Sequence, residues 1–179
     1  MVTGDSSDRV TFLDAAGDDE FLATETRNTM TGIGYSLAAA NIFDVTSVSR
    51  QGHDTATLEG TSSSDHFIGT ELHAQRNNQS GELITIGFSE VVIDGHSGFD
   101  TLVLHGGQSH NEYLLSATHA TATLSGVQLH AENIEHTIAV AHHQTDRATI
   151  RGGAISERLY STETTTILTA ANYQNVVLN

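Results

Sequence analysis

An acidic group near the start of the chain is the first feature that could do chemistry. Its members are Asp14, Asp18, Asp19 and Glu20. Calcium ions in proteins are held by several oxygen ligands, many of them carboxylates. The group is therefore a candidate calcium site. The alternative is a solvated turn whose aspartates accept hydrogen bonds from nearby backbone amides.

Histidines form the second suggestive pattern. Four of them recur at steps of 23 residues, at His73, His96, His119 and His142. If one structural coil contains 23 residues, their side chains form a column. Imidazoles bind Zn²⁺ and Ni²⁺, and stacked histidines repel one another when mild acid charges them. The column is a candidate metal ladder or pH sensor, and the alternative is a surface column of neutral rings.

A catalytic turn is the third candidate. The stretch Asp94-Gly-His-Ser-Gly98 is similar to a catalytic Gly-His-Gly turn of glycan-active β-helix enzymes. However, lysine and tryptophan are absent, the arginines are scattered, and the acidic composition opposes acidic substrates. We therefore assign no catalytic residue and favour a non-enzymatic protein. A polysaccharide-binding or glycan-degrading β-helix enzyme is the alternative, because paired carboxylates across a groove are not visible in a sequence.

Any such site must be positioned by a repeating scaffold, because the chain follows a period of 46 residues. Four aspartates at this spacing each open a short strand-like run: Asp8, Asp54, Asp100 and Asp146. A period without insertions is typical of repeat proteins whose units stack on one another. We predict one solenoid domain over 1–179, with units 8–53, 54–99, 100–145 and 146–179, the last one partial. The repeated aspartates are expected to bond the amides of their own turns.

A weaker half-period of 23 residues divides each unit. Apolar residues recur at this step in the series Phe12, Tyr35, Leu58, Leu104, Val127, Ile150 and Tyr173, broken only at Gly81. Strand-like runs alternate apolar and polar residues over 10–13, 21–24 and 42–48. The pattern predicts an all-β, right-handed parallel β-helix with 23-residue coils, and a short helix over 36–41 interrupting one coil. Roughly eight coils would give a rod about 35–40 Å long. A β-sandwich is the alternative fold.

Composition excludes several classes of partner. The formal net charge is −15, with seven arginines against 22 carboxylates. Nucleic acids are recognised through cationic patches, so this surface repels them. It also repels anionic membranes, attracts divalent cations and keeps the protein soluble. No apolar run approaches the length of a transmembrane helix, so membrane insertion is not expected.

Short Gly-x-Asp pieces recur along the chain, in Ala16-Gly-Asp-Asp-Glu-Phe21, Gly52-His-Asp-Thr-Ala-Thr-Leu58 and Gly98-Phe-Asp-Thr-Leu-Val-Leu104. They resemble half of the calcium-binding nonapeptide of RTX-type secreted bacterial proteins. The whole unit resembles the degenerate repeats of very large exported bacterial proteins, marine planctomycetes among them. Here the motifs stand 35 or 46 residues apart, whereas RTX copies are consecutive. The resemblance implies an extracellular or cell-surface location and calcium as a ligand.

We therefore expect a structural or adhesive segment of a larger secreted or cell-surface bacterial protein. No cofactor is required by this interpretation, and calcium at the acidic turns is the candidate ion. Expected partners are a neutral glycan or another surface protein. End-to-end association of copies is also expected, because an uncovered solenoid end presents unpaired strand edges.

Overall fold

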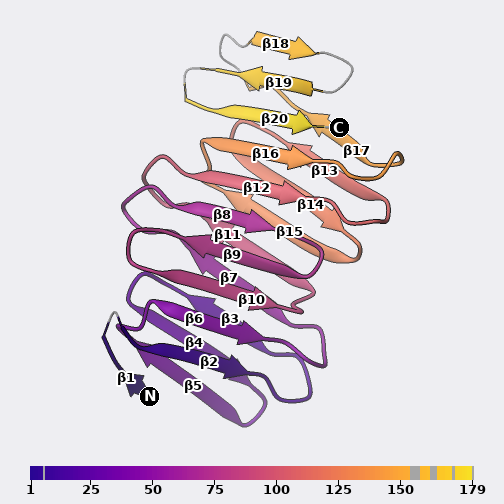
Figure 1. Cartoon of the computed structure of the whole chain (residues 1–179). Helices are drawn as coiled ribbons and strands as arrows, with labels where there is room; N and C mark the ends of the chain where they lie inside the picture. The colour runs from indigo at the N-terminus through magenta and orange to yellow at the C-terminus, as the bar shows by residue number, and fades with distance from the viewer. Residues whose placement is uncertain (6, 154–157, 162–164, 171, 179) are drawn as a thin grey trace.

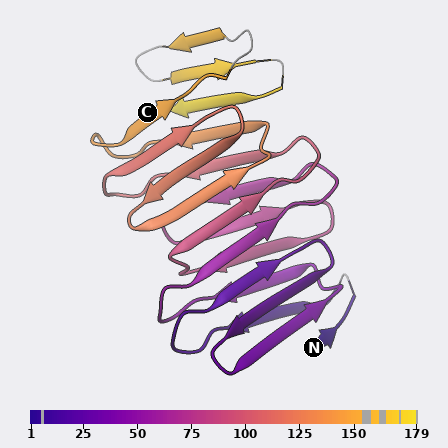
Figure 2. The ribbon, with the colours of Figure 1, turned by 180° about the vertical axis from the view of Figure 1, so that it is seen from behind.

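A computed structural model describes residues 1–5, 7–153, 158–161, 165–170 and 172–178 as two facing β-sheets of ten strands each. Figure 1 shows one sheet in front, and Figure 2 shows the other from behind. The N-terminus lies at one end of the stack and the last strands lie at the other. The described residues include no helix, and thus none that could cross a membrane.

The two sheets are named here A and B, and their strands are given in the order of their hydrogen-bonded neighbours. Sheet A contains β1 (Val2–Thr3), β5 (Tyr35–Ala40), β4 (Arg27–Gly32), β3 (Glu20–Ala23), β7 (Thr55–Glu59), β11 (Glu90–Asp94), β15 (Val127–Glu132), β14 (His119–Leu124), β13 (Asn111–Leu115) and β17 (Arg147–Ile150). Sheet B contains β18 (Arg158–Ser161), β19 (Thr165–Thr169), β20 (Gln174–Leu178), β16 (His136–Val140), β12 (Thr101–His105), β8 (His66–Gly69), β9 (His73–Asn77), β10 (Glu82–Ile86), β6 (Asp44–Val48) and β2 (Arg9–Leu13).

Each complete sequence unit contributes five strands, the middle three of which form an antiparallel meander. In the first unit β2 lies in sheet B, the meander β3–β5 lies in sheet A, and β6 returns to sheet B. The next unit begins with β7 in sheet A and places its meander β8–β10 in sheet B. The chain crosses between the sheets three times per unit. Because three is odd, residues at corresponding positions of consecutive units lie on opposite sheets.

The predicted all-β solenoid is confirmed, but its coils are longer than 23 residues. Parallel neighbours lie 35 residues apart in most pairs, as in Arg9 with Asp44, and 37 or 38 residues apart in the others, as in Val2 with Ala39 and Glu90 with Gln128. The extra length is the hairpin that each meander inserts into a coil. Alternation of apolar and polar residues has the same period in parallel strands and in hairpins, so the sequence pattern did not separate them. The apolar series at steps of 23 residues is therefore divided between the two sheets.

The helix expected over 36–41 is also corrected. These residues lie mostly in β5, which pairs antiparallel with β4. The three alanines in this strand have high helix propensity, but Ala39 is fully buried between the sheets. Burial against neighbouring strands overrides intrinsic propensity.

The core is a thin layer between the sheets. Its largest buried side chains include Phe21, Phe67 and Met30. The Phe12 and Phe21 rings pack with centroids 5.4 Å apart, joining β2 of sheet B to β3 of sheet A. Elsewhere leucines and alanines fill the layer, and the sheets approach closely at some points. A Cβ added at Gly69 would lie 2.5 Å from Leu129 Cδ1 of the facing sheet.

Candidate cation site

A hydrogen bond between coils recurs in successive units. The backbone N–H of Asp19, just before β3, donates to Asp54 Oδ1, just before β7, at 2.7 Å. The same bond joins Asp65 to Asp100 at 2.7 Å and Asn111 to Asp146 at 2.8 Å. The repeated aspartates from Asp54 onwards therefore accept a hydrogen bond from the preceding coil. The sequence predicted hydrogen bonds only within the turn of each aspartate.

Three homologous groups of residues surround these bonds at steps of 46 residues. We call them the first, second and third turn clusters. They consist of Asp14, Asp19 and Asp54; of Gly60, Asp65 and Asp100; and of Gly106, Asn111 and Asp146. The number of carboxylates falls from three to two to one along the chain.

The first turn cluster holds three carboxylates at very short range. Asp14, Asp19 and Asp54 each offer an oxygen, and these oxygens all lie within 4.8 Å of one another. Asp19 is 5% exposed and Asp54 is 0% exposed. The backbone N–H of Arg50 donates to Asp14 Oδ2 at 2.7 Å, and the Ser49 hydroxyl donates to Asp54 Oδ2 at 2.5 Å. In the described part of the chain, no arginine or histidine forms an ion pair with them.

Several oxygens of this cluster are buried without a hydrogen-bond partner among the described residues. They are Asp14 Oδ1, Asp19 Oδ2 and the hydroxyl of the adjacent Tyr35. Burial, together with the side chain of Asp19 beside it, raises the pKa of Tyr35 to about 12. Gly32 in β4 makes room for the carboxylate, because a Cβ there would lie 1.7 Å from Asp19 Oδ1.

The structure separates the four acidic residues that the sequence grouped together. Asp14 and Asp19 lie in the first turn cluster. Asp18 turns to the neighbouring coil, where its Oδ1 accepts the backbone N–H of His53 at 2.8 Å, and Glu20 is exposed at the start of β3. Asp54 was missed as a partner because it lies 35 residues after Asp19. The sequence places Asp54 in the aspartate series, but a coil of 23 residues predicts other residues beside it than Asp19.

The second turn cluster supplies protein donors to one carboxylate. Asp65 Oδ2 accepts the backbone N–H of Thr61 at 2.6 Å and its hydroxyl at 3.0 Å. Asp65 Oδ1 accepts the Asn78 side-chain amide at 2.9 Å. Asp100, in contrast, has an oxygen, Oδ2, that is buried without a hydrogen-bond partner among the described residues. Burial, followed by the nearby Asp65 and Glu135, raises the pKa of Asp100 to about 6.

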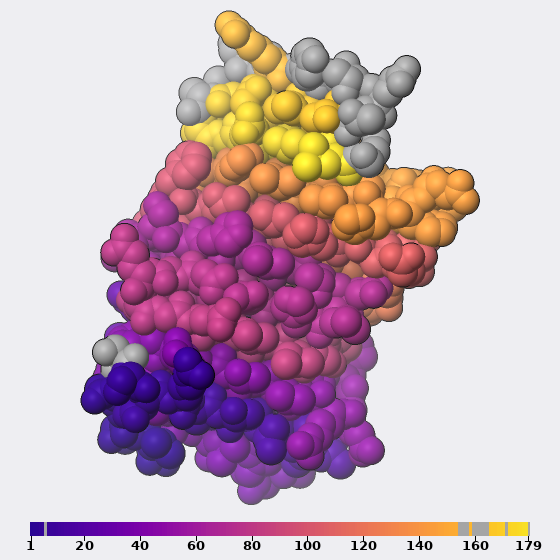
Figure 3. All heavy atoms as spheres, viewed as in Figure 1, coloured from indigo at the N-terminus to yellow at the C-terminus, as the bar shows by residue number. Residues whose placement is uncertain are grey.

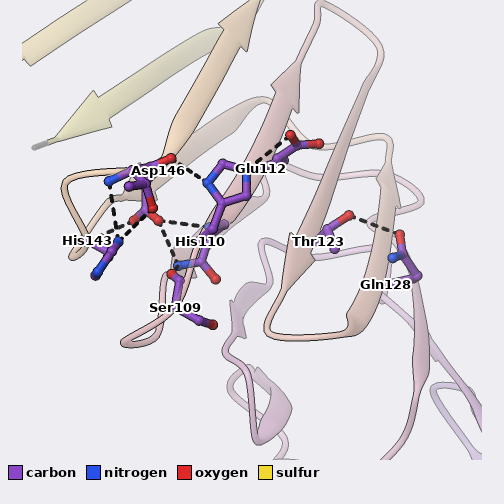
Figure 4. Close-up of polar contacts among 9 residues, drawn as sticks. Ser109, His110, Glu112, Thr123, Gln128, His143 and Asp146 are labelled. Atoms are coloured by element: carbon purple, nitrogen blue, oxygen red, sulfur yellow. Dashed lines mark hydrogen bonds and ion pairs between the residues drawn. The ribbon is translucent and has the colours of Figure 1, made fainter.

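The third turn cluster surrounds a single carboxylate with donors, and dashed lines converge on Asp146 in Figure 4. Asp146 Oδ2 accepts the backbone N–H groups of His142 and His143, each at 3.0 Å. Its Oδ1 accepts the backbone N–H of Asn111 at 2.8 Å and the Asn111 side-chain amide at 3.0 Å. Burial works in the opposite direction, but these N–H donors lower the pKa of Asp146.

The four histidines spaced by 23 residues do not meet in one column. His73 begins β9 in sheet B and His119 begins β14 in sheet A, while His96 and His142 follow β11 and β16. Instead, His142 stacks on His105, with ring centroids 6.1 Å apart and planes 11° apart. Burial, followed by the proximity of His142 and His73, lowers the pKa of His105.

The predicted Gly-His turn lies in a surface hollow of about 620 Å³. His96 Nε2 lies 3.6 Å from Glu59 Oε2, and its Nδ1 lies 3.4 Å from Asp94 Oδ2. His96 therefore lies between Glu59, which lines the hollow, and Asp94, which does not.

Comparisons with known proteins add no relative to this picture. No protein-family model matches the chain, and neither the curated proteins nor the solved structures searched give a match. The geometry of the fold and of its turn clusters is therefore the basis for inferring a function.

Proposed function

We propose that this chain is a non-enzymatic structural segment, a spacer, of a large secreted or cell-surface bacterial protein. The observation that carries the proposal is the continuity of the two ten-stranded sheets, in which each coil hydrogen-bonds to the next. Such a stack has stiffness along its length, because bending requires ladder hydrogen bonds to open. The acidic surface keeps the segment soluble and gathers cations.

The outer surface supports the same proposal. On the face in Figure 3 the side chains form a continuous surface over the stacked strands. The hollow around His96 is shallow, and of its two lining carboxylates, Glu25 and Glu59, the second lies 3.6 Å from His96 Nε2. A glycosidase needs two carboxylates free to act on opposite sides of a sugar bond. An adhesive role toward a neutral glycan or a surface protein is compatible with this surface.

Solution scattering combined with a polysaccharide screen tests the proposal. Ten strands at about 4.8 Å give an expected stack about 45 Å long. We expect a particle of this length and no release of reducing sugar from neutral polysaccharides. Cleavage of a polysaccharide that disappears in a Glu59→Gln variant would overturn the spacer and establish the enzyme.

End-to-end association is part of the proposal. Strand β2 lies at the edge of sheet B, and only the two residues of β1 cover β5 at the same end of sheet A. Unpaired edges of this kind recruit further strands. Sedimentation velocity should show a concentration-dependent increase in mass. A single monomeric species at all concentrations would exclude association of free copies.

A further inference from the structure

We propose that the first turn cluster is a Ca²⁺ site, with Asp14, Asp19 and Asp54 as its protein ligands. The proposal deepens the spacer function, on which it rests for the role of the ion. The location of the site rests on geometry alone. The three ligands come from the β2–β3 turn and from the residue before β7, so one ion would join two successive coils.

The distances fit a single bound ion. Two oxygens bound to one Ca²⁺ at about 2.4 Å each lie at most about 4.8 Å apart. The three carboxylates each place an oxygen within 4.8 Å of the others. Only oxygen donors converge here, and oxygen donors select hard cations such as Ca²⁺ over Zn²⁺ or Ni²⁺. Water completes the coordination shell in many Ca²⁺ sites, so three protein ligands are a sufficient frame.

A second observation points to a ligand independently of the acidic cluster. Asp19 is 5% exposed, and its Oδ2 is buried without a hydrogen-bond partner among the described residues. Asp14 Oδ1 is in the same condition. A buried carboxylate oxygen without a donor carries a large desolvation penalty. A bound cation removes that penalty for both oxygens.

The second unit shows what the first unit lacks. The residues that donate to Asp65 in the second turn cluster are Thr61 and Asn78. The corresponding residues of the first unit, 46 positions earlier, are Ala15 and Gly32, which have no donor side chain. The first unit therefore has the most carboxylates, and its Asp19 lacks the two side-chain donors that Asp65 has. A cation accounts for both differences.

The third carboxylate could not be added to the other clusters without rearrangement. A Cβ at Gly60 would lie 2.4 Å from the Gly95 carbonyl oxygen, and one at Gly106 would lie 2.5 Å from the Tyr113 hydroxyl. Asp14 thus marks the one turn among the three clusters with room for a third ligand. This confines the proposed site to the first unit.

The experiment is a titration of the chain with Tb³⁺ and Ca²⁺, followed by calorimetry with Ca²⁺ and with Mg²⁺. The chain has no tryptophan, and Tyr35 lies beside the cluster, so tyrosine excitation should sensitise Tb³⁺ emission. Added Ca²⁺ should displace Tb³⁺ and quench this emission. A Tyr35→Phe variant should lose the emission and keep its calorimetric affinity for Ca²⁺.

Asp14→Asn and Asp18→Asn form a matched pair of variants. Each removes one negative charge from the same turn, but the Asp18 carboxylate is bonded to His53 outside the cluster. We expect Asp14→Asn to weaken Ca²⁺ binding by about tenfold or more, because affinity follows ligand charge. We expect Asp18→Asn to change binding by less than about twofold. If Asp14→Asn fails to fold, Asp14→Gly reproduces the residue that the second and third units carry.

The outcomes are separable from those of the spacer test. Absence of Ca²⁺ binding, or equal weakening by both variants, would overturn the site. Equal affinity for Mg²⁺ would overturn the assignment to Ca²⁺. Each of these results leaves the scattering length and the polysaccharide screen unchanged. Conversely, polysaccharide cleavage would overturn the spacer and leave the ion site standing.

Discussion

The first and third turn clusters occupy the same place in their units but treat a buried carboxylate in opposite ways. In the first, three carboxylates converge and two of them keep an oxygen without a donor among the described residues. In the third, Asn111 replaces one aspartate and glycine replaces another, and four N–H donors surround Asp146. One backbone geometry therefore supports either the proposed cation site or a hydrogen-bonded aspartate.

The second turn cluster is intermediate between the first and the third. Asp65 accepts hydrogen bonds from the side chains of Thr61 and Asn78, whereas Asp100 has one oxygen without a partner among the described residues. The repeated inter-coil bond is common to all three clusters. What differs is how the remaining charge is accommodated: by the proposed cation in the first cluster, by the raised pKa of Asp100 in the second and by N–H donors in the third.

The largest expected effect comes from restoring an aspartate in the third cluster. Asn111 is 0% exposed, and its amide donates to the Ser109 carbonyl oxygen at 2.7 Å and to Asp146 at 3.0 Å. In Asn111→Asp a carboxylate faces two acceptors, so we expect a loss of about 3–5 kcal/mol in the free energy of unfolding at neutral pH. Urea denaturation measures it.

Gln108→Glu is the control for that variant. It makes the same amide-to-carboxylate change at an exposed position of the same turn, and we expect a change within about 0.5 kcal/mol. Calcium should not rescue Asn111→Asp, because Gly106 supplies no third carboxylate. A loss of less than about 1 kcal/mol in the free energy of unfolding of Asn111→Asp would show that the turn rearranges to accommodate a second carboxylate. The difference between the first and third turn clusters would then be smaller than the hydrogen bonds indicate.

The second prediction concerns Asp100 and pH. Its pKa in the folded chain is about 6 against an ordinary 3.8, so the folded state holds the proton more tightly. Stability should therefore fall as the pH rises from about 4 to about 6, and then level off. The carboxylates of Asp65, Glu135 and Asp94 face this group and contribute to the shift. Asp100→Asn should be more stable than the parent chain above pH 6, by about 1–2 kcal/mol, and should lack this slope.

Asp146→Asn is the control of opposite sign. The pKa of Asp146 is lowered in the folded chain, so its contribution is present above the ordinary value and is lost as the pH falls below it. Asp146→Asn should lose about 1.5–3 kcal/mol at neutral pH, because charged hydrogen bonds disappear. Urea denaturation of both variants from pH 3 to pH 8 measures the difference. Equal changes of the same sign in the free energy of unfolding of the two variants would contradict the opposite pKa shifts of Asp100 and Asp146.

Much of the fold was accessible from the sequence, because its period is carried by residue types. The aspartate series beginning at Asp8 gave the 46-residue unit, and alternation gave an all-β solenoid. The coil length was not accessible. A 23-residue coil places Thr31 next to Asp54, whereas the register places Asp19 there. The hairpin that lengthens each coil has the same alternation as the strands that it joins.

The candidate site was accessible only in part. Asp14 and Asp19 stood out as neighbours in sequence, but a third ligand from another coil requires the register. One signal was present and went unused. Aligning the units at 46 residues sets Ala15 against Thr61 and Gly32 against Asn78, which shows that Asp19 lacks the two donor side chains that Asp65 has.

The smallest predicted effect tests that donor difference directly. Thr61→Ala gives the second cluster the residue that the first cluster has at Ala15. Thr61 is 8% exposed, and its hydroxyl lies 3.0 Å from Asp65 Oδ2, so we expect a loss of about 1 kcal/mol on urea denaturation. The backbone N–H at 2.6 Å remains, which limits the loss. Ser62→Ala, at the exposed neighbouring position, should change stability by less than about 0.5 kcal/mol.

The response of Thr61→Ala to calcium makes the comparison between clusters sharper. Gly60 provides no carboxylate, so the variant should gain no calcium-dependent stability beyond that of the parent chain. Thermal unfolding with calcium and with excess chelator measures this. If Thr61→Ala did gain such stability, two carboxylates and a missing donor would be enough to hold the ion. Calcium binding in the first cluster would then result from the lack of donor side chains at the positions of Thr61 and Asn78, and not from the presence of Asp14.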